Sequence, residues 1–352
     1  MFTAGQTLTR AINRVRRARV QPINKTNFIS WAQAWAIAAT ERALVRGDLE
    51  SADLKASRIR IHQRQSSVII FLELKCQQQP FYPLCKIFHG GQFRGEDRQR
   101  HRHRRAVQIK RAAGFNNTAR RLLSNNAVNF EPIIDVDVPR IATLSARMPG
   151  HTIDKLLRWE LLKCENARSL EAEAWEGLGR GLRILDDQLR ICADPAADIL
   201  REQGNTSAAK EQKSESAVGC RCPVCAKARD RLNELGPAWK AWSHGDLNLA
   251  NLLYDSKYGW TLIDASWVKR YLGFDLAFLV MQLELARTVP SALTRSLVAP
   301  LLDGYHHCLP DDSDWQQARL RLLLRSTNSQ VARSRDYGHC RLLRDPHIEA
   351  VP

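Results

Sequence analysis

The stretch from His244 to Asp264 constrains the fold more than any other part of this 352-residue chain. Asp246 is followed five residues later by Asn251, and Asp264 comes thirteen residues after that. Each polar residue adjoins apolar residues of the kind that form short strands. Gly, Asp and Asn are also common turn residues, so a plain turn is the alternative. We favour a site, because three polar positions at fixed spacing within an apolar frame seldom recur.

These residue types suit phosphoryl transfer from a nucleotide. A carboxylate can orient an acceptor hydroxyl, and carboxylate and amide oxygens are hard ligands for magnesium. The spacing H-x-D-x-x-x-x-N that begins at His244 resembles the catalytic loop of the protein-kinase-like phosphotransferases. The glycine after this histidine is the form typical of the aminoglycoside phosphotransferase and choline kinase-like branch.

The resemblance implies an α+β, bilobal protein-kinase-like fold with a small β-rich N-lobe and a mainly helical C-lobe. It implies that Asp246 is the catalytic carboxylate, that Asn251 and Asp264 are metal ligands, and that ATP and Mg²⁺ are the cofactors. Gly273 to Ala277 resembles a family element whose Asp braces the catalytic loop. Ala265 departs from the family, which usually has a larger apolar residue after the metal-binding Asp.

Residues 58–150 are predicted to form the nucleotide-binding lobe. Apolar, β-rich runs at 68–74 and 81–88 predict a hairpin. Lys86 is the one charge in the second run, and the resemblance implies that it binds nucleotide phosphates; an exposed edge-strand lysine is the alternative. Glu96 is the candidate for the acidic partner of this lysine, although a surface acid at a helix N-terminus is equally consistent.

The hinge and the first C-lobe helix are placed mainly by their order in the chain. Runs at 133–136 and 141–150 predict the last N-lobe strands, so the hinge backbone from Ser145 to Met148 would bind the adenine. Apolar residues at helical spacing from 169 to 190 predict the long helix that precedes the catalytic loop. The chain has no glycine between positions 47 and 90, so a glycine-rich phosphate loop is missing there.

The charge of the chain is strongly positive, +16 from 53 basic and 37 acidic residues. It favours anionic partners, but the basic stretches lack the interleaved aromatic residues of single-strand binders, which argues against nucleic acid. Residues 1–57 are predicted to be a basic helical N-terminal extension that faces solvent; a transit peptide, or a helix bound to RNA or lipid, is the alternative. Residues 151–318 are the predicted C-lobe, and 319–352 a basic tail.

The nine cysteines include Cys220, Cys222 and Cys225. They lie at 193–236, where a polar centre predicts a flexible insertion. Three close thiolates can bind zinc with a fourth ligand, but there is no second Cys pair, so we favour reduced thiols. The odd cysteine count and the lack of a secretory signal predict a cytoplasmic protein. No apolar run reaches the roughly 18 residues of a membrane span.

The sequence therefore predicts an ATP-dependent phosphotransferase whose partners are a nucleotide and a small-molecule hydroxyl substrate. The alternative is a catalytically weak kinase-fold protein that binds nucleotide as a regulatory or interaction module. The missing glycine loop and Ala265 motivate that alternative. Substrate charge stays open, because the segment 271–318 is locally acidic although the whole chain is basic.

Overall fold

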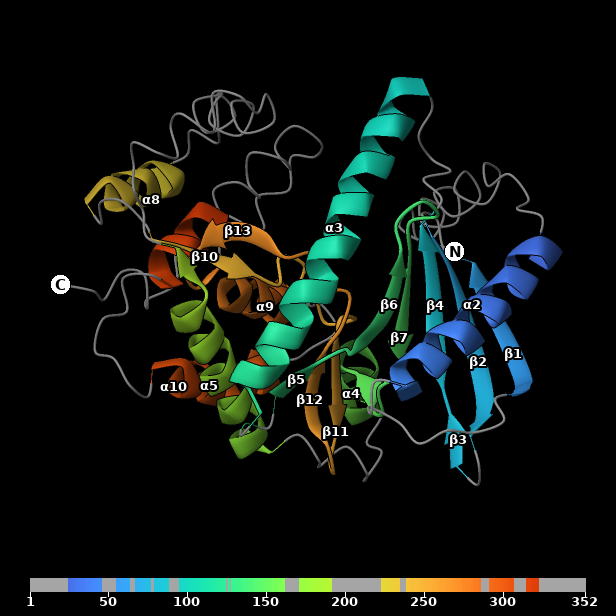
Figure 1. The fold of residues 1–352 in the computed structure, drawn as a ribbon. Coiled ribbons are helices and arrows are strands. Elements are labelled where there is room, and N and C mark those ends of the chain that lie inside the picture. The colour runs from blue at the N-terminus through green and yellow to red at the C-terminus, as the bar shows by residue number, and fades with distance from the viewer. Residues whose placement is uncertain are drawn as a thin grey trace, which may run out of the picture. The chain divides into compact units, whose positions relative to one another are not determined.

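The protein folds into two compact units in the computed structural model. The first comprises Met1–Thr118 and Phe130–Met148, and the second comprises Ala119–Asn129 and Pro149–Pro352. The first is built around a β-sheet and the second is mainly helical (Figure 1), which confirms the predicted α+β class. The structure describes residues 25–45, 55–63, 67–76, 79–88, 95–124, 126, 128–161, 171–191, 223–234, 239–285, 291–306 and 315–322.

The sheet of the first unit is antiparallel and follows the order β1-β2-β4-β7-β6, with β3 paired to β2. Its strands are β1 (Lys55–Gln63), β2 (Ser67–Cys76), β3 (Gln79–Phe81), β4 (Pro83–Phe88), β6 (Ile133–Asp137) and β7 (Ala142–Ala146). The strands predicted at 68–74, 81–88 and 133–136 are confirmed, with an interruption at Tyr82 between β3 and β4, whereas the run at 141–150 forms a strand only over Ala142–Ala146.

Helix α2 (Lys25–Val45) lies across one face of this sheet (Figure 1). Its buried Ala32, Ala36 and Ala39 are small enough to bring the helix backbone close to the strands. They share a core with Val68, Ile70, Leu72, Cys85, Ile87, Ala142 and Leu144. The prediction of a solvent-facing extension is therefore wrong for the described residues of α2, because the basic residues that suggested it lie mostly at 1–24, outside the described part of the chain.

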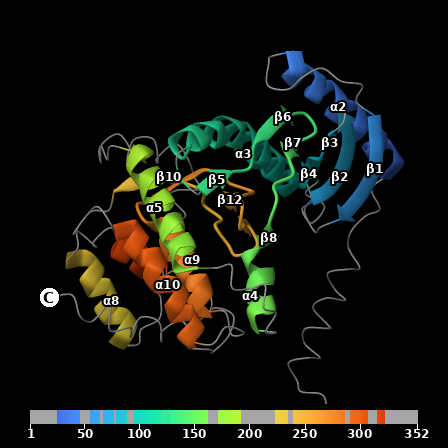
Figure 2. The ribbon, with the colours of Figure 1, turned by 90° about the horizontal axis from the view of Figure 1, so that it is seen from below.

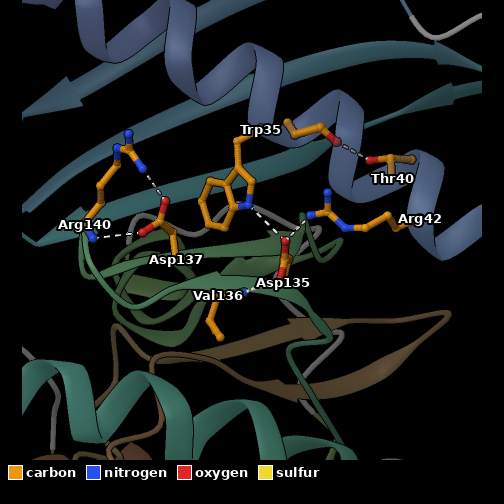
Figure 3. Close-up of polar contacts among 8 residues, drawn as sticks. Trp35, Thr40, Arg42, Asp135, Val136, Asp137 and Arg140 are labelled. Atoms are coloured by element: carbon orange, nitrogen blue, oxygen red, sulfur yellow. Dashed lines mark hydrogen bonds and ion pairs between the residues drawn. The ribbon is translucent and has the colours of Figure 1, made fainter.

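The edge strand β6 also holds α2 through polar contacts (Figure 3). Trp35 Nε1 donates a hydrogen bond to Asp135 Oδ2 at 2.9 Å, and the Arg42 guanidinium donates to the same oxygen at 2.6 Å. Arg42 is mostly exposed, so its ion pair contributes little. The buried alanine face must therefore supply most of the stability of this contact.

Helix α3 (Gly95–Leu122) follows β4 and carries the chain from the first unit into the second. Ile109, Ala112, Asn116 and Ala119 are buried along one side. Arginine, lysine and histidine dominate the rest of the helix, as the predicted basic run implied. Asn116 Nδ2 donates to the backbone oxygen of Glu131 at 2.8 Å, so a polar residue within the helix is satisfied.

The second unit contains two small sheets. One has the order β5-β12-β11-β8 and the other β13-β10-β9. The strands are β5 (Val128–Phe130), β8 (His151–Thr152), β9 (Arg190–Ile191), β10 (Lys240–Ser243), β11 (Leu252–Asp255), β12 (Gly259–Leu262) and β13 (Val268–Tyr271). β10 directly precedes His244 and β11 directly follows Asn251, so these two strands fix both ends of the predicted catalytic loop.

The helices of this unit are α4 (Ile153–Leu161), α5 (Ala172–Gln188), α8 (Pro223–Glu234), α9 (Phe274–Leu285), α10 (Ser291–His306) and the helical residues 315–322. Figure 2 shows α5, α9 and α10 side by side. A Cβ atom added at Gly179 would lie 2.1 Å from Leu301 O, and one at Gly304 would lie 2.0 Å from Glu176 O. These glycines therefore let α5 and α10 pack backbone against backbone. The helix predicted at 169–190 is confirmed by α5.

Two expected segments are described only in part. Within the insertion expected at 193–236, residues 223–234 form α8, in which Ala228 is buried. Cys220 and Cys222 lie outside the described residues, and Cys225 falls within α8. Of the tail at 319–352, only 319–322 is described, and it is helical. None of the described helices combines the length and the apolar character needed to cross a membrane.

Candidate active site

The predicted catalytic loop connects β10 to β11. Asp246 is exposed within it, whereas Asn251 is buried at its end. The amide Nδ2 of Asn251 donates to Asp246 O at 2.9 Å and approaches Asp246 Oδ2 at 3.3 Å. Two of the three motif residues are therefore in direct contact.

Asn248 is a second amide beside the same carboxylate. Its Nδ2 lies 3.2 Å from Asp246 Oδ1, and its Oδ1 accepts a hydrogen bond from Ala250 N at 3.0 Å. Asn248 and Asn251 together contact both oxygens of Asp246, which limits rotation of the carboxylate. Sequence reasoning missed Asn248, although an Asn two residues after an Asp in a turn is a signal for such bonds.

Asp264 joins this loop through its neighbour in the chain. Ile263 N donates to Asn251 O at 3.0 Å, and Ile263 O lies 2.9 Å from His244 Nε2. Asp264 itself has φ +60°, a left-handed conformation that residues other than glycine seldom adopt and that costs roughly 1–2 kcal/mol. Such conformations concentrate at functional sites. The fold thus brings the two ends of the motif together.

His244 is structural and uncharged at neutral pH. It is buried, and burial lowers its pKa to about 4. A neutral imidazole donates from one nitrogen only. Since Nε2 faces the oxygen of Ile263, this nitrogen carries the proton, and Nδ1 is left as the acceptor facing Asp246 N at 3.4 Å. The ring therefore links the end of β12 to the start of the catalytic loop.

Asp275 braces the loop from the first turn of α9, the role that the resemblance implied for it. Its Oδ2 accepts a hydrogen bond from His244 N at 2.6 Å, and its Oδ1 accepts one from Gly245 N at 2.9 Å. Burial raises the pKa of this carboxyl to about 6, while the two backbone N–H groups act in the opposite direction. Both oxygens of one buried side chain thus position the backbone immediately before Asp246.

Trp267 supplies apolar packing that Ala265 does not. Its side chain is fully buried, and its backbone has φ +43°. Ser266 N and Trp267 N both donate to His244 O, at 2.8 and 3.3 Å. A large apolar side chain is therefore present three residues after Asp264. Sequence reasoning missed this displacement, because the family comparison looks only at the residue directly after the Asp.

In the first unit, Lys86 lies on the sheet face opposite α2. Alternation along β4 buries Cys85 and Ile87 against α2 and leaves Lys86 half-buried on the other face. Its Nζ lies 5.0 Å from the ring centroid of Phe88, and the guanidinium carbon of Arg105 lies 5.2 Å from the same centroid. Two cations therefore contact one aromatic ring, and the second comes from α3.

The other predicted nucleotide contacts lie on separate elements of the first unit. Ser145 is buried in β7, where its Cα pairs with both Leu84 and Ile133, and its Oγ donates to Glu131 Oε1 at 2.5 Å. Met148 is half-buried two residues beyond the end of β7. Glu96 lies in the first turn of α3. The Ser145–Glu131 hydrogen bond was not anticipated from the sequence.

The donor set in the loop fits magnesium. Because Nδ2 of Asn251 faces Asp246 O, the amide oxygen Oδ1 is the end that remains to accept a metal ion. Asp264 adds a carboxylate, and Mg²⁺ typically binds one or two protein oxygens together with phosphates and water. The described residues contain no group of three His, Cys, Asp or Glu side chains that could hold a metal by themselves.

No protein-family model and no curated protein sequence matches the chain. The similar solved structures come from the branch that the loop motif resembles. A macrolide 2′-phosphotransferase from Brachybacterium faecium has 13% identity and a TM-score of 0.47, covering 87% of this chain and 96% of that one. A Plasmodium vivax ethanolamine kinase has 12% identity and a TM-score of 0.46, covering 83% of both chains.

An aminoglycoside phosphotransferase from Streptomyces rimosus has 14% identity and a TM-score of 0.40, covering 85% of this chain and 98% of that one. All three TM-scores are below 0.5 and all three identities are below 25%. The geometry of the site residues, rather than these likenesses, therefore carries the functional proposal.

Proposed function

We propose that this protein is an ATP-dependent phosphotransferase that moves the γ-phosphoryl group to a hydroxyl of a small molecule. The observation that supports this most is the contact network of the loop. The Asn251 side chain donates a hydrogen bond to Asp246 O at 2.9 Å. Asn251 O accepts one at 3.0 Å from the N–H of Ile263, the neighbour of Asp264. A carboxylate for the acceptor and one oxygen ligand for a metal thus lie in the loop, and Asp264 directly follows the residue that is hydrogen-bonded to Asn251.

In the proposed reaction, Asp246 accepts a hydrogen bond from the acceptor hydroxyl and thereby orients its oxygen. A bond forms between this oxygen and the γ-phosphorus, while the bond from that phosphorus to the leaving oxygen of ADP breaks. The hydroxyl proton passes late to Asp246, because a loose transition state needs positioning more than a strong base. Asn248 and Asn251 hold the carboxylate in place for this step.

The remaining roles follow from the chemistry of each residue. Asn251 and Asp264 would hold Mg²⁺, whose charge stabilises the nucleotide phosphates. Lys86 would bind these phosphates with its ammonium group while its aliphatic stem packs in the sheet. The backbone between Ser145 and Met148 would bind the adenine. Reduced thiols, such as the buried free Cys85, are consistent with action in the cytoplasm.

Thermal unfolding with nucleotide tests this proposal without a known substrate. We expect ATP to raise the melting temperature only when Mg²⁺ is present, because the metal would bridge the loop and the nucleotide phosphates. A hundredfold excess of ATP over Kd would add about 2.7 kcal/mol to the free energy of unfolding. Magnesium alone and adenosine with magnesium are the controls. If no nucleotide shifts the parent protein, the proposal is wrong. A positive result leads to a screen of polyols, aminoglycosides and amino alcohols for ADP release.

One observation favours the catalytically weak alternative. The part of α3 beside Phe88 and Lys86 presents Arg105. The resemblance implied an acidic residue of this helix at that place, with Glu96 as the candidate. If the protein is a nucleotide-dependent regulatory module, ATP should bind without turnover. Binding together with measurable ADP release would favour the enzyme instead.

A further inference from the structure

Behind the catalytic loop lies a second buried carboxylate that the proposed reaction does not use directly. Asp186 is at the C-terminal end of α5 and is 5% exposed. Its Oδ2 accepts a hydrogen bond from the hydroxyl of Tyr305 at 2.6 Å and another from Gly273 N at 2.9 Å. Buried carboxylates are costly unless they are hydrogen-bonded. A carboxylate placed here therefore calls for an explanation beyond packing.

The hydrogen bond from Gly273 N to Asp186 connects Asp186 to the start of α9. This glycine directly precedes α9, has φ +75°, and accepts the hydrogen bond from Ala277 N at 2.9 Å. A Cβ atom here would lie 2.7 Å from the Cα of Trp315, so no other residue fits. Asp186 thus fixes the backbone N–H of the residue that directly precedes α9.

Two residues further along α9 is Asp275, which holds the backbone N–H groups of His244 and Gly245. A continuous path of hydrogen bonds and one short covalent step therefore runs from Tyr305 on α10 through Asp186 and Gly273 to Asp275. From there it reaches the residue before Asp246. All of these residues belong to the second unit.

The helices that carry this path are closely fixed. Gly179 and Gly304 bring α5 and α10 into backbone contact, and Arg183 stands with its guanidinium carbon 5.3 Å from the Tyr305 ring. Arg183 also donates to Asp187 at 3.0 Å. Because the helix pair can shift little, a displacement of Asp186 relative to α9 would be passed to Asp275 rather than absorbed.

We propose that Asp186 is a positioning residue that, together with Tyr305, orients the catalytic loop through Gly273 and Asp275. It touches neither substrate nor nucleotide, and its effect passes through the two N–H groups that Asp275 holds. The inference rests on the proposed function insofar as the loop is catalytic, but the hydrogen-bonded path exists independently of it.

The test is amide hydrogen exchange at His244 and Gly245 in the full-length protein. Asp186→Ala removes the acceptor, so we expect exchange of these two amides to rise about tenfold or more. Asp186→Asn retains an acceptor oxygen and should stay within about threefold of the parent. Glu173→Ala is the matched control, because its carboxylate is on the same helix but exposed, and it should behave as the parent does.

The proposal is overturned if Asp186→Ala raises exchange at these amides no more than Glu173→Ala does, even with a lower melting temperature. Should Asp186→Ala fail to fold, Tyr305→Phe decides instead, since it removes only the hydroxyl that fixes the carboxylate. We expect a severalfold rise there, and parental exchange would refute the proposal. A parent that binds no ATP would contradict the proposed function while leaving the exchange result interpretable.

Discussion

The two units present their candidate residues in different ways. In the second unit, hydrogen bonds join His244, Asp246 and Asn251 to one another and to Ile263, the neighbour of Asp264, and Asp275 braces the loop. In the first unit, the candidates lie on three separate elements, β4, α3 and β7. A loop that is stabilised by local hydrogen bonds can be predicted from sequence. A site assembled from strands and a helix depends on tertiary contacts, which a local pattern does not reveal.

The largest expected effect is that of Asp246→Asn in the second unit. The variant keeps the shape and both neighbouring amides but loses the charge that orients and deprotonates the acceptor. We expect turnover to fall roughly 10²-fold or more, with ATP affinity unchanged. Turnover with any hydroxyl compound that the parent accepts is the measurement. Asp255→Asn, at the end of β11, is the control, and equal turnover by both variants would contradict the assignment.

In the first unit, the largest expected effect is on stability rather than on turnover. Ala36 is fully buried between α2 and the sheet, while Ala34 on the same helix is exposed. Ala36→Leu should reduce the free energy of unfolding by about 1–3 kcal/mol through overpacking. Ala34→Leu should change it by less than about 0.5 kcal/mol. Urea unfolding compares the two, and equal effects would show that α2 is not docked on the sheet.

Lys86→Met should lower turnover severalfold or more while leaving the melting temperature near that of the parent. Methionine retains the packing of the aliphatic stem but removes the charge that would bind phosphate. Lys110→Met, on the exposed side of α3, is the matched control. Full activity of Lys86→Met together with loss in the control would mean that α3, not β4, supplies the phosphate-binding cation.

The smallest expected effect is a pH dependence of stability in the second unit. Burial raises the pKa of Asp186 to about 7 from 3.8, and the groups facing this carboxyl are Tyr305, Asp275 and Arg183. A carboxyl with a raised folded-state pKa is protonated more readily when folded. Its contribution to stability is therefore fully present below about pH 4 and is lost as the pH rises towards 7.

Urea unfolding from pH 5 to 8 tests this sign. The stability of the parent relative to Asp186→Asn should decline as the pH rises to about 7 and be level above it. If this difference is independent of pH, Asp186 is ionised throughout, and the direction given for its pKa is wrong.

Much of the second unit could be predicted because its signals are local. The spacing from His244 to Asp264 and the periodicity that defines α5 are each contained in one short segment. Asn248 and Trp267 were missed although they lie in the same stretch, because the family pattern does not include them. Asp186 could not be found, since its partners are 87 and 119 residues away in sequence.

The first unit was predictable at the level of strands but not of contacts. The β-rich runs located β2, β4, β6 and β7, and the alternation along β4 decides which face Lys86 occupies. The docking of α2 depends on three buried alanines, which are weakly hydrophobic and do not form an obvious apolar stripe. Arg105 beside Phe88 likewise depends on how α3 lies on the sheet, which no local pattern reveals.

The central claim, that the loop is a magnesium-dependent phosphotransfer site, is tested most directly by calorimetric titration of ATP into the parent and Asp264→Ala, with and without Mg²⁺. We predict that magnesium strengthens ATP binding to the parent and that Asp264→Ala loses this effect, because an ionised ligand is removed. Asn251→Ala should reduce the magnesium-dependent gain in ATP affinity by a smaller amount. Asp303→Ala, at an exposed position, should match the parent. Unchanged magnesium-dependent affinity in Asp264→Ala would contradict the claim.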